Sequence, residues 1–322
     1  MTANRQRKAC VQKYADNIGG DELYRRCKHT PTKGNAMRRA LIVTGLAALA
    51  SVALTAPANA KPVAPGAGVS AGTATVATAG FAAKGRPPVI GDRGSKAAPP
   101  SSLAALAVNY QYGSGYQYAT AQGASGFFRV AQPSLAAADS HTLAELAVQS
   151  ADGLQIVEIG WTVDRSLYGD ALPRLFVFHW IDGIATCYNA CGFVPYDAAA
   201  RPGIALANGS TPKFTIQHYQ GNWWIGLNSL WVGYYPDSRW GGRYTQSGLT
   251  QWFGEVAAGS ATPCTDMGTG AFASSVSAAT ITNLAFISGP ATNVTTFQTH
   301  PAHYTASRTT ANSIRYGGPG AC

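Results

Sequence analysis

Short runs of β-branched and aromatic residues, separated by turn signals, limit this chain to a small set of folds. They span residues 155–163, 174–181, 213–220, 222–229, 230–237 and 249–256. Asp-Gly, Gln-Gly, Pro-Asp and Gly-Gly pairs lie between them, and short strands joined by such turns form antiparallel sheets. The composition favours the same structure, because the 322 residues include 36 glycines and 15 tyrosines and only 12% are charged. We expect an all-β fold, an antiparallel β-sandwich of two packed, curved sheets.

The first sixty residues contain the three parts of an export signal. Met37-Arg38-Arg39 supplies positive charge, residues 40–56 form an apolar run, and Ala58-Asn59-Ala60 is a small-residue cleavage site. We therefore predict a signal peptide at residues 37–60, cleaved near Ala60, and a secreted mature chain. A transmembrane helix is the alternative, but the run is short for a bilayer. Residues 1–36 are polar and precede the signal, so we interpret them as a mispredicted extension.

Composition divides the rest of the chain near residue 108. Residues 61–108 are rich in Ala, Gly, Pro and Ser and have no apolar period, which predicts a low-complexity linker or a short pro-segment. Residues 109–322 form the predicted folded domain. Ten of the 24 lysines and arginines lie in residues 1–60, so the net charge of +9 belongs mainly to the leader. We therefore expect no nucleic-acid partner and no stable membrane association after cleavage. We make no prediction of the oligomeric state from the sequence.

Four cysteines follow the predicted cleavage site: Cys187, Cys191, Cys264 and Cys322. An even number in an exported chain indicates disulfide bonds, and three pairings are possible. The short loop TCYNACGF favours a bond between its own two cysteines, which leaves Cys264 to hold the C-terminal residue. A zinc site is the alternative reading of Cys-x3-Cys, but no clear second Cys/His pair accompanies it. His300 and His303 also have no obvious third ligand, so we expect neither a metal nor another cofactor.

Two strongly apolar runs each carry a glutamate. Alternation along residues 155–163 predicts one face formed by Val157, Ile159, Trp161 and Val163, and places Glu158 on the other face with Gly160. Glu255 likewise shares a face with Gln251 and Phe253. Only one other glutamate, Glu145, lies beyond residue 109. An unpaired carboxylate in an apolar strand is costly to desolvate, so the placement indicates function. An exposed or arginine-paired side chain is the alternative.

Eight motifs occur in order over most of residues 110–322: EIGWTVDRSLYGD, RLFVFHW, TCYNACGFV, GNWWIG, VGYYP, WFGEV, MGTG and YGGPGAC. This series resembles the neprosin family of secreted glutamic peptidases, which includes plant post-proline endopeptidases. The resemblance implies a β-sandwich with a cleft on one face, catalytic glutamates at Glu158 and Glu255, and the two disulfides favoured above. It also implies that residues 134–149, whose pattern would suit a helix, form a strand.

The chain differs from the plant members of that family at three places. It has WFGEV where they have WGGEV, so Phe253 lies beside the second glutamate. Its CYN-x-C loop is one residue shorter, and residues 61–108 are shorter and simpler than the plant activation domain. These differences bear on proline specificity and on zymogen control.

The expected chemistry is peptide hydrolysis by a water molecule activated between Glu158 and Glu255. One carboxylate accepts a proton from water. The other, protonated, donates a hydrogen bond to the scissile carbonyl and later helps to protonate the leaving nitrogen. Two neighbouring carboxyls share a proton, which predicts an acidic optimum. The resemblance implies a protein or peptide substrate, with possible cleavage after proline. The roles of the two glutamates are not assigned from sequence, nor are substrate-binding residues.

Supporting residues are less clearly marked by the sequence. Gln251, Tyr234 and Asn228 are candidates for stabilising the oxyanion, although structural roles suit them better. The tryptophans at 161, 223, 224 and 231 are expected mainly in the core, although one or two could line a pocket that accepts proline. The alternative functions are a secreted glycoside hydrolase that uses the same glutamates, and a non-catalytic lectin-like module that binds carbohydrate.

Overall fold

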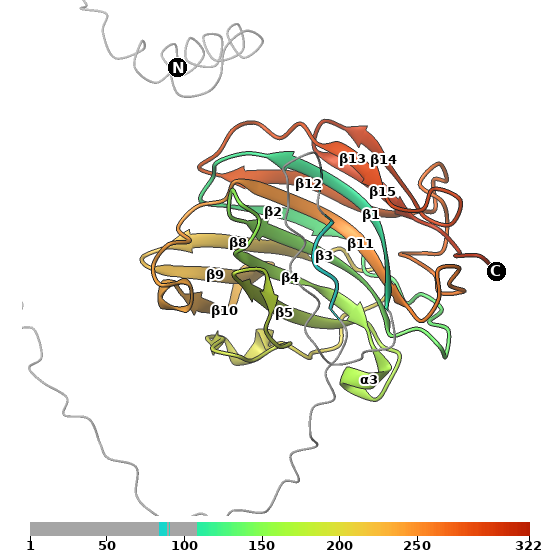
Figure 1. Ribbon diagram of the computed structural model, residues 1–322, viewed down its shortest axis with the longest axis horizontal. Coiled ribbons are helices and arrows are strands. Elements are labelled where there is room, and N and C mark those ends of the chain that lie inside the picture. The colour runs from blue at the N-terminus through green and yellow to red at the C-terminus, as the bar shows by residue number, and fades with distance from the viewer. Residues whose placement is uncertain (1–83, 89, 91–107) are drawn as a thin grey trace, which may run out of the picture. The chain divides into compact units, whose positions relative to one another are not determined.

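The computed structural model describes residues 84–88, 90 and 108–322, all within one compact unit, Gly72–Cys322. The predicted extension and signal peptide lie outside the described residues. Two antiparallel sheets pack face to face, as an antiparallel β-sandwich requires (Figure 1). This confirms the fold class expected from the sequence. Within the described part of the chain, no helix has the length and apolar character needed to span a membrane.

One sheet has seven strands, in the order β13 (Thr295–Gln298), β1 (Asn109–Tyr118), β11 (Leu249–Ala258), β3 (His141–Gln149), β4 (Ile156–Val163), β5 (Arg174–Ile181) and β6 (Ile184–Ala185). The other has eight, in the order β14 (Thr305–Thr310), β15 (Ser313–Gly317), β12 (Ala279–Ile287), β2 (Gly123–Phe128), β8 (Lys213–Tyr219), β9 (Asn222–Leu227), β10 (Leu230–Pro236) and β7 (Val194–Pro195). The helical segments of the described residues are short: α3 (Arg165–Tyr168), η1 (Ala198–Ala200) and η2 (Asp237–Trp240).

The main core lies between the two sheets, where strand alternation buries every second side chain. The four residues predicted on the core side of β4, Val157, Ile159, Trp161 and Val163, all lie there with 0% exposure. Gly254 faces the same core from β11, and the ring of Tyr316 occupies the space that a Cβ atom would need. The other side of the seven-stranded sheet is therefore left for the alternate residues, including Glu158 and Glu255.

The two predicted disulfides are present in the structure. Cys187 and Cys191 are joined with their Cα atoms 5.8 Å apart, and Cys264 and Cys322 with theirs 5.0 Å apart. The first bond closes a tight loop after β6, and the second fastens the end of the chain.

Candidate active site

Three adjacent strands of the seven-stranded sheet each place one glutamate on the same side. Glu255 lies on β11, Glu145 on β3 and Glu158 on β4, and these strands are neighbours in the sheet. In the antiparallel register Leu143 pairs with Glu255, and Ala147 pairs with Glu158. Directly paired residues share a face, as do residues two apart. All three carboxylates therefore lie on one surface, called the site face below, and each is 0% exposed.

Glycine at position 160 makes this grouping possible. Gly160 pairs with Glu145 across β3 and β4. A Cβ atom there would meet the backbone oxygen of Ala144, the Cβ of Glu145 at 2.7 Å and the ring of Phe176 at 2.8 Å. Sequence alternation indicated that Gly160 leaves room beside Glu158, and the structure shows that Glu145 and Phe176 fill that room.

A lysine from upstream of the sandwich lies among the three carboxylates. Lys84 Nζ is 2.8 Å from Glu145 Oε1, 3.2 Å from Glu158 Oε2 and 3.9 Å from Glu255 Oε2. Its side chain is only 1% exposed. One nitrogen thus stands within reach of both predicted catalytic carboxylates, which places Glu158 and Glu255 around a single point. Neither Lys84 nor Glu145 was among the site residues predicted from the sequence.

The three glutamates differ in their affinity for a proton. Burial raises the pKa of Glu158 to about 7, with repulsion from Glu255 adding to the effect and Lys84 and the indole of Trp180 opposing it. Burial and repulsion from Glu158 raise the pKa of Glu145 well above its ordinary value. Burial would also raise the pKa of Glu255, but Lys84 and His141 outweigh it, and that pKa is lowered. Glu255 is therefore the carboxylate that ionises first.

His141, the first residue of β3, holds Glu255 in place. Its Nε2 lies 2.8 Å from Glu255 Oε1, and its Nδ1 lies 3.9 Å from Oδ2 of Asp164. Asp164 follows β4 and is fixed there because its other oxygen caps α3 by accepting from the amides of Ser166 and Leu167. A buried row of aspartate, histidine and glutamate thus supports the carboxylate that ionises first.

The rest of the site face is apolar and aromatic. Phe176, Phe178, Trp180 and Tyr188 form a buried cluster together with Phe253. Tyr188 comes from the loop closed by the Cys187–Cys191 bond, and its ring lies 5.5 Å from that of Phe176 and 5.0 Å from that of Phe178. This wall lowers the local polarity and strengthens electrostatic interactions among the carboxylates.

Of the three oxyanion candidates, only Gln251 lies on the site face. It is 0% exposed, and its Nε2 donates to the carbonyl oxygen of Pro88 at 3.1 Å. Tyr234 packs against Trp224 in the eight-stranded sheet, with ring centres 4.6 Å apart. Asn228 accepts a hydrogen bond from the amide of Lys213 at the turn between β9 and β10. The last two therefore have structural roles away from the glutamates.

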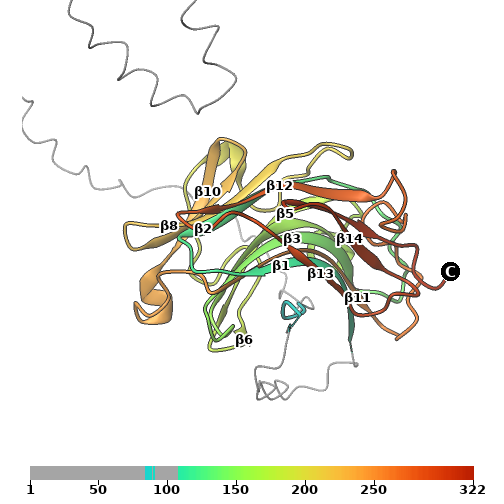
Figure 2. The same cartoon turned by 90° about the horizontal axis from the view of Figure 1, so that it is seen from above.

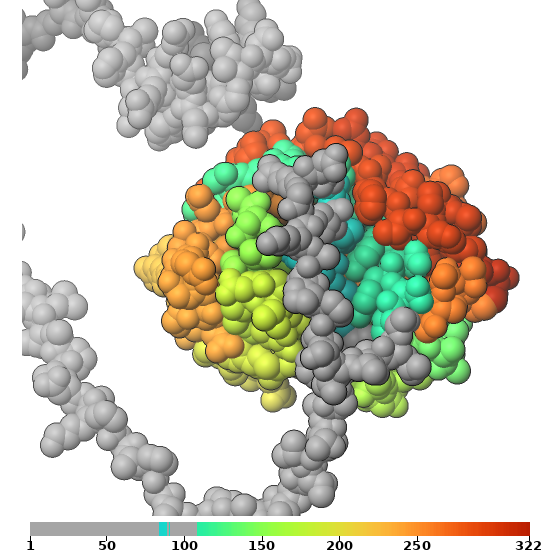
Figure 3. Space-filling view, viewed as in Figure 1, coloured from blue at the N-terminus to red at the C-terminus, as the bar shows by residue number. Residues whose placement is uncertain are grey.

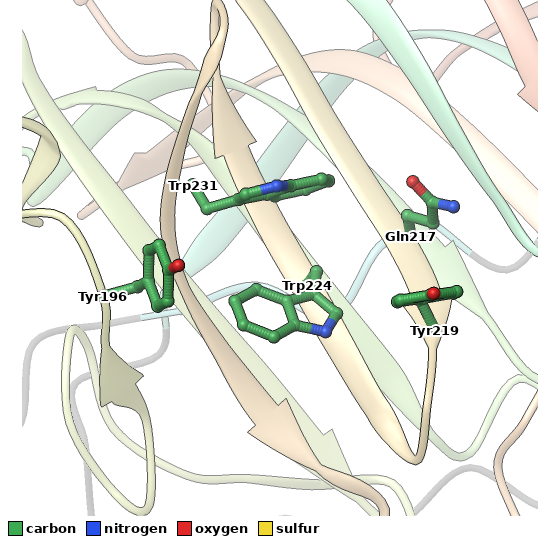
Figure 4. Close-up of a pocket in the computed structure, with 5 residues that line it drawn as sticks. All are labelled: Tyr196, Gln217, Tyr219, Trp224 and Trp231. Carbon is green, nitrogen blue, oxygen red and sulfur yellow. The ribbon is translucent and has the colours of Figure 1, made fainter. Parts of the chain in front are cut away.

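A hollow lined by aromatic residues lies on the outer face of the eight-stranded sheet (Figure 4). Its lining comprises Tyr196, Gln217, Tyr219, Trp224 and Trp231. Trp161 and Trp223 are buried in the core as expected, whereas Trp224 and Trp231 are half-buried and line this hollow, on the sheet that does not carry the glutamates. His300 and His303, between β13 and β14, pack against each other with ring centres 4.3 Å apart.

The family resemblance implies peptide hydrolysis, and for that reaction replacing His141 by glutamine is expected to move the acid limb of the kcat/KM profile to higher pH. The histidine lowers the pKa of Glu255, so its removal lets Glu255 take up a proton at a higher pH. The control is the same substitution at His218, which lies on β8 of the other sheet and contacts Asp237. It should leave the acid limb in place. Rates of peptide hydrolysis across the pH range provide the measurement. An unmoved limb in the His141 variant would mean that Glu255 does not set it.

Comparison with known proteins gives one family match and several distant structural likenesses. The model of the neprosin family matches residues 138–319. A crystal structure of scytalido-glutamic peptidase with a transition state analog inhibitor is 10% identical, with a TM-score of 0.42, over 66% of this chain and 100% of that one. SCP-B, an eqolisin-family peptidase in complex with the tripeptide Ala-Ile-His, is 9% identical, with a TM-score of 0.36 and the same coverage.

A glycoside hydrolase family 16 endo-glucanase from Bacteroides ovatus is also similar. It is 11% identical, with a TM-score of 0.27, over 48% of this chain and 68% of that one. Scores and identities this low do not by themselves indicate a shared activity.

Proposed function

The chain belongs to the neprosin family, and we propose that it is a glutamic peptidase in which Glu158 and Glu255 activate a water molecule. One observation carries the proposal: two buried glutamates from different strands both reach the same lysine nitrogen, at 3.2 Å and 3.9 Å. A group bound between them, such as a water molecule or the amide of a substrate, would meet both carboxyls at once.

The two glutamates take different roles because their proton affinities differ. Glu255, with the lowered pKa, is the base that removes a proton from water. Glu158, with a pKa of about 7, is the acid that donates a hydrogen bond to the scissile carbonyl. The water oxygen bonds to the carbonyl carbon, the carbon–nitrogen bond breaks, and a proton from the pair goes to the leaving nitrogen. Peptide hydrolysis then leaves one proton shared between the carboxyls, as at the start.

The rate should be greatest on the acid side of neutrality. Activity requires Glu158 to be protonated, so it falls as pH rises through the pKa of that group, about 7. It also requires Glu255 to be ionised, so it falls again when acid protonates that carboxylate. The two carboxyls titrate as one coupled pair. The two limbs of the pH profile therefore give the pKa values of the pair and not those of the separate residues.

We also propose that the protein is secreted after cleavage near Ala60 and that its substrates are peptides, including peptides with proline at the cut. The motifs shared with the neprosin family, which includes plant post-proline endopeptidases, support the preference for proline. N-terminal sequencing of protein from the culture medium tests the export. Paired peptides that differ only by proline or alanine at the cut test the preference.

A carbohydrate-binding role is the second candidate, and the aromatic hollow of Figure 4 favours it. Tryptophan and tyrosine rings on a sheet surface offer apolar faces for sugar rings. A direct comparison separates the functions: the purified full chain is incubated at acid pH with peptides and, separately, with polysaccharides. Peptide fragments that appear in wild type, but not in Glu255→Gln, support the peptidase. Sugar release with intact peptides, or sugar binding without turnover, would overturn it.

A further inference from the structure

The aromatic hollow of Figure 4 lies on the opposite side of the sandwich from the site face. Figure 2 shows the two sheets as layers, with β8 and β10 in one layer and β1 and β11 in the other. Figure 3 looks onto the seven-stranded sheet, where residues 84–88 and 90 lie over the site face. The main core fills the space between the two layers. A ligand in the hollow therefore cannot contact Glu158 or Glu255.

Strand pairing gathers the lining residues on the outer face of the eight-stranded sheet. Gln217 on β8 pairs with Trp224 on β9, and directly paired residues share a face. Their neighbours Ile216 and Ile225 are buried in the main core. Tyr196 follows β7, and its amide donates a hydrogen bond to a carbonyl of β10. An outer sheet face usually carries polar side chains, so a group of aromatic rings there indicates a binding surface.

The rings are turned so that they enclose a space and do not close on one another. The planes of Tyr196 and Trp224 make an angle of 83°, with ring centres 5.4 Å apart. Those of Trp224 and Trp231 make an angle of 58°, with centres 5.8 Å apart. Figure 4 shows Trp224 between Tyr196 and Tyr219. The hollow has a volume of about 370 Å³, which suits a ligand of one or two rings.

Two of these rings are held in place by their neighbours on the sheet. A Cβ atom at Gly226 would lie 3.2 Å and 3.3 Å from two atoms of the Trp231 ring, so the indole rests directly on β9. Trp224 packs against Tyr234, with ring centres 4.6 Å apart. Rings that are positioned before a ligand arrives lose less conformational entropy when it binds.

The polar groups of the hollow are uncharged and accessible. The five lining residues are tyrosine, tryptophan and glutamine, and they offer no cation for a phosphate and no carboxylate for an ammonium group. Within the described residues, the side-chain amide of Gln217 and the hydroxyls of Tyr196 and Tyr219 make no hydrogen bond. The two tyrosines are 66% and 55% exposed. Because amides and hydroxyls both donate and accept, they are complementary to a neutral ligand that carries hydroxyl groups.

From this arrangement we propose that the hollow binds neutral β-linked glycans, with a pyranose ring against Trp224, while the site face hydrolyses peptides. β-linked glucose and xylose carry hydroxyl groups around the rim of the ring and C–H groups on its flat faces. The aromatic rings of the hollow therefore meet the faces, and Gln217 and the tyrosines meet the rim. Sugar binding is then not an alternative to hydrolysis, because opposite sheets perform the two activities. Retention on a polysaccharide would keep the peptidase close to proteins held in the same material.

The test is the binding of cellohexaose and xylohexaose to the full chain, measured by calorimetry at mildly acid pH. Wild type should bind at least one of them, and Trp224→Ala should weaken that binding at least about tenfold because it removes the stacking surface. Gly226→Ala keeps every lining side chain but displaces the Trp231 ring, and should weaken binding about threefold. Phe272→Ala removes an exposed ring outside the hollow and is the control, which should bind like wild type.

Three results would overturn the proposed glycan site. The first is binding of neither sugar by wild type. The second is equal binding by wild type and by the Trp224 and Gly226 variants, which would place the sugar elsewhere. The third is binding of decaproline or of choline at the hollow in place of both sugars, which would assign it to an extended peptide or to a quaternary ammonium ligand.

A second measurement separates the glycan site from the proposed peptidase. Saturating cellohexaose or xylohexaose should leave the initial rate of peptide hydrolysis by wild type unchanged, and Glu255→Gln should bind the sugar as tightly as wild type. Inhibition of hydrolysis by the sugar would contradict two separate sites. If the sugar binds at the hollow but no peptide is cleaved at any pH, the proposed function fails while the glycan site stands. If peptides are cleaved and neither sugar binds, the reverse holds.

Discussion

Glu255→Gln is expected to lower kcat/KM for a peptide substrate by about a thousandfold, within the range of general acid–base catalysis. Glutamine keeps the shape of the side chain and its contact with His141, but it cannot accept a proton from water. Glu158→Gln should lose less, about a hundredfold, because the amide still donates a hydrogen bond to the scissile carbonyl and lacks only the proton for the leaving group. Initial rates at the optimum pH of each variant are the measurement.

Glu145→Gln is the matched control for these two variants. It removes a carboxylate of equal burial from the same face, but it leaves the proposed base and acid in place. Its loss should stay below that of Glu158→Gln. A larger loss in Glu158→Gln than in Glu255→Gln would reverse the two roles, and a full loss in Glu145→Gln would make Glu145 a member of the catalytic group.

Gly160→Ala should destabilise the fold by roughly 3 kcal/mol, the size expected when an atom is forced into a closely packed strand interior. Its new methyl group would lie 2.7 Å from the Cβ of Glu145 and 2.8 Å from the ring of Phe176, and it would also meet the backbone of β3. The strand cannot move away, because β3 and β5 flank it on both sides. Chemical denaturation monitored by tryptophan fluorescence gives the change in unfolding free energy.

Gly226→Ala provides the comparison for that experiment. Gly226 also lies inside a strand, on β9, but the nearest atoms to an added Cβ belong to the ring of Trp231, at 3.2 Å and 3.3 Å. A half-buried ring at the surface can shift, so the loss should be below about 1 kcal/mol. Equal losses in the two variants would show that the contact between Gly160 and Glu145 is not the cause.

Much of the architecture follows from local sequence. The predicted run at 174–181 coincides with β5, and the runs at 213–220, 222–229, 230–237 and 249–256 match β8, β9, β10 and β11 to within two residues. Aromatic and β-branched residues between strong turn signals make such strands recognisable. Strands without that composition were not recognised from the residues alone, although the family resemblance implied the strand within residues 134–149, where β3 lies. β1, with the sequence NYQYGSGYQY, is rich in glycine and polar residues, and its position depends on pairing with β11 and β13.

The site was only half predictable because its members meet through pairings that are not local. Alternation alone placed Glu158 and Glu255 opposite the core, and both lie there. Glu145 was set apart because it lies in the run HTLAELAVQ, whose alanine, leucine and glutamate favour a helix in isolation. In the structure all nine residues of β3 are buried between neighbouring strands and packed faces, and this context outweighs the intrinsic preference. The signal that could have identified Glu145 is that it is one of only three glutamates beyond residue 109.

Lys84 was missed for a different reason. It lies in a low-complexity region whose composition predicts no fixed structure. The three buried carboxylates, together with hydrogen bonds to the neighbouring main chain, explain why a lysine from that region lies against the sheet, and the grouping of the carboxylates depends on the register of β3 with β4 and β11. A region that has no core of its own can still be positioned by a charged site elsewhere in the chain.

The most direct test of the proposed catalytic pair is a carbon-13 NMR titration of the glutamate carboxyl groups. The chain contains four glutamates, Glu22, Glu145, Glu158 and Glu255, so selective labelling gives few signals, and each glutamine variant assigns one. The proposed roles predict that Glu158 keeps its proton to a pH of about 7 and that Glu255 is still ionised below its ordinary range. Titration of Glu158 and Glu255 together near the ordinary glutamate value would contradict a pair divided into acid and base.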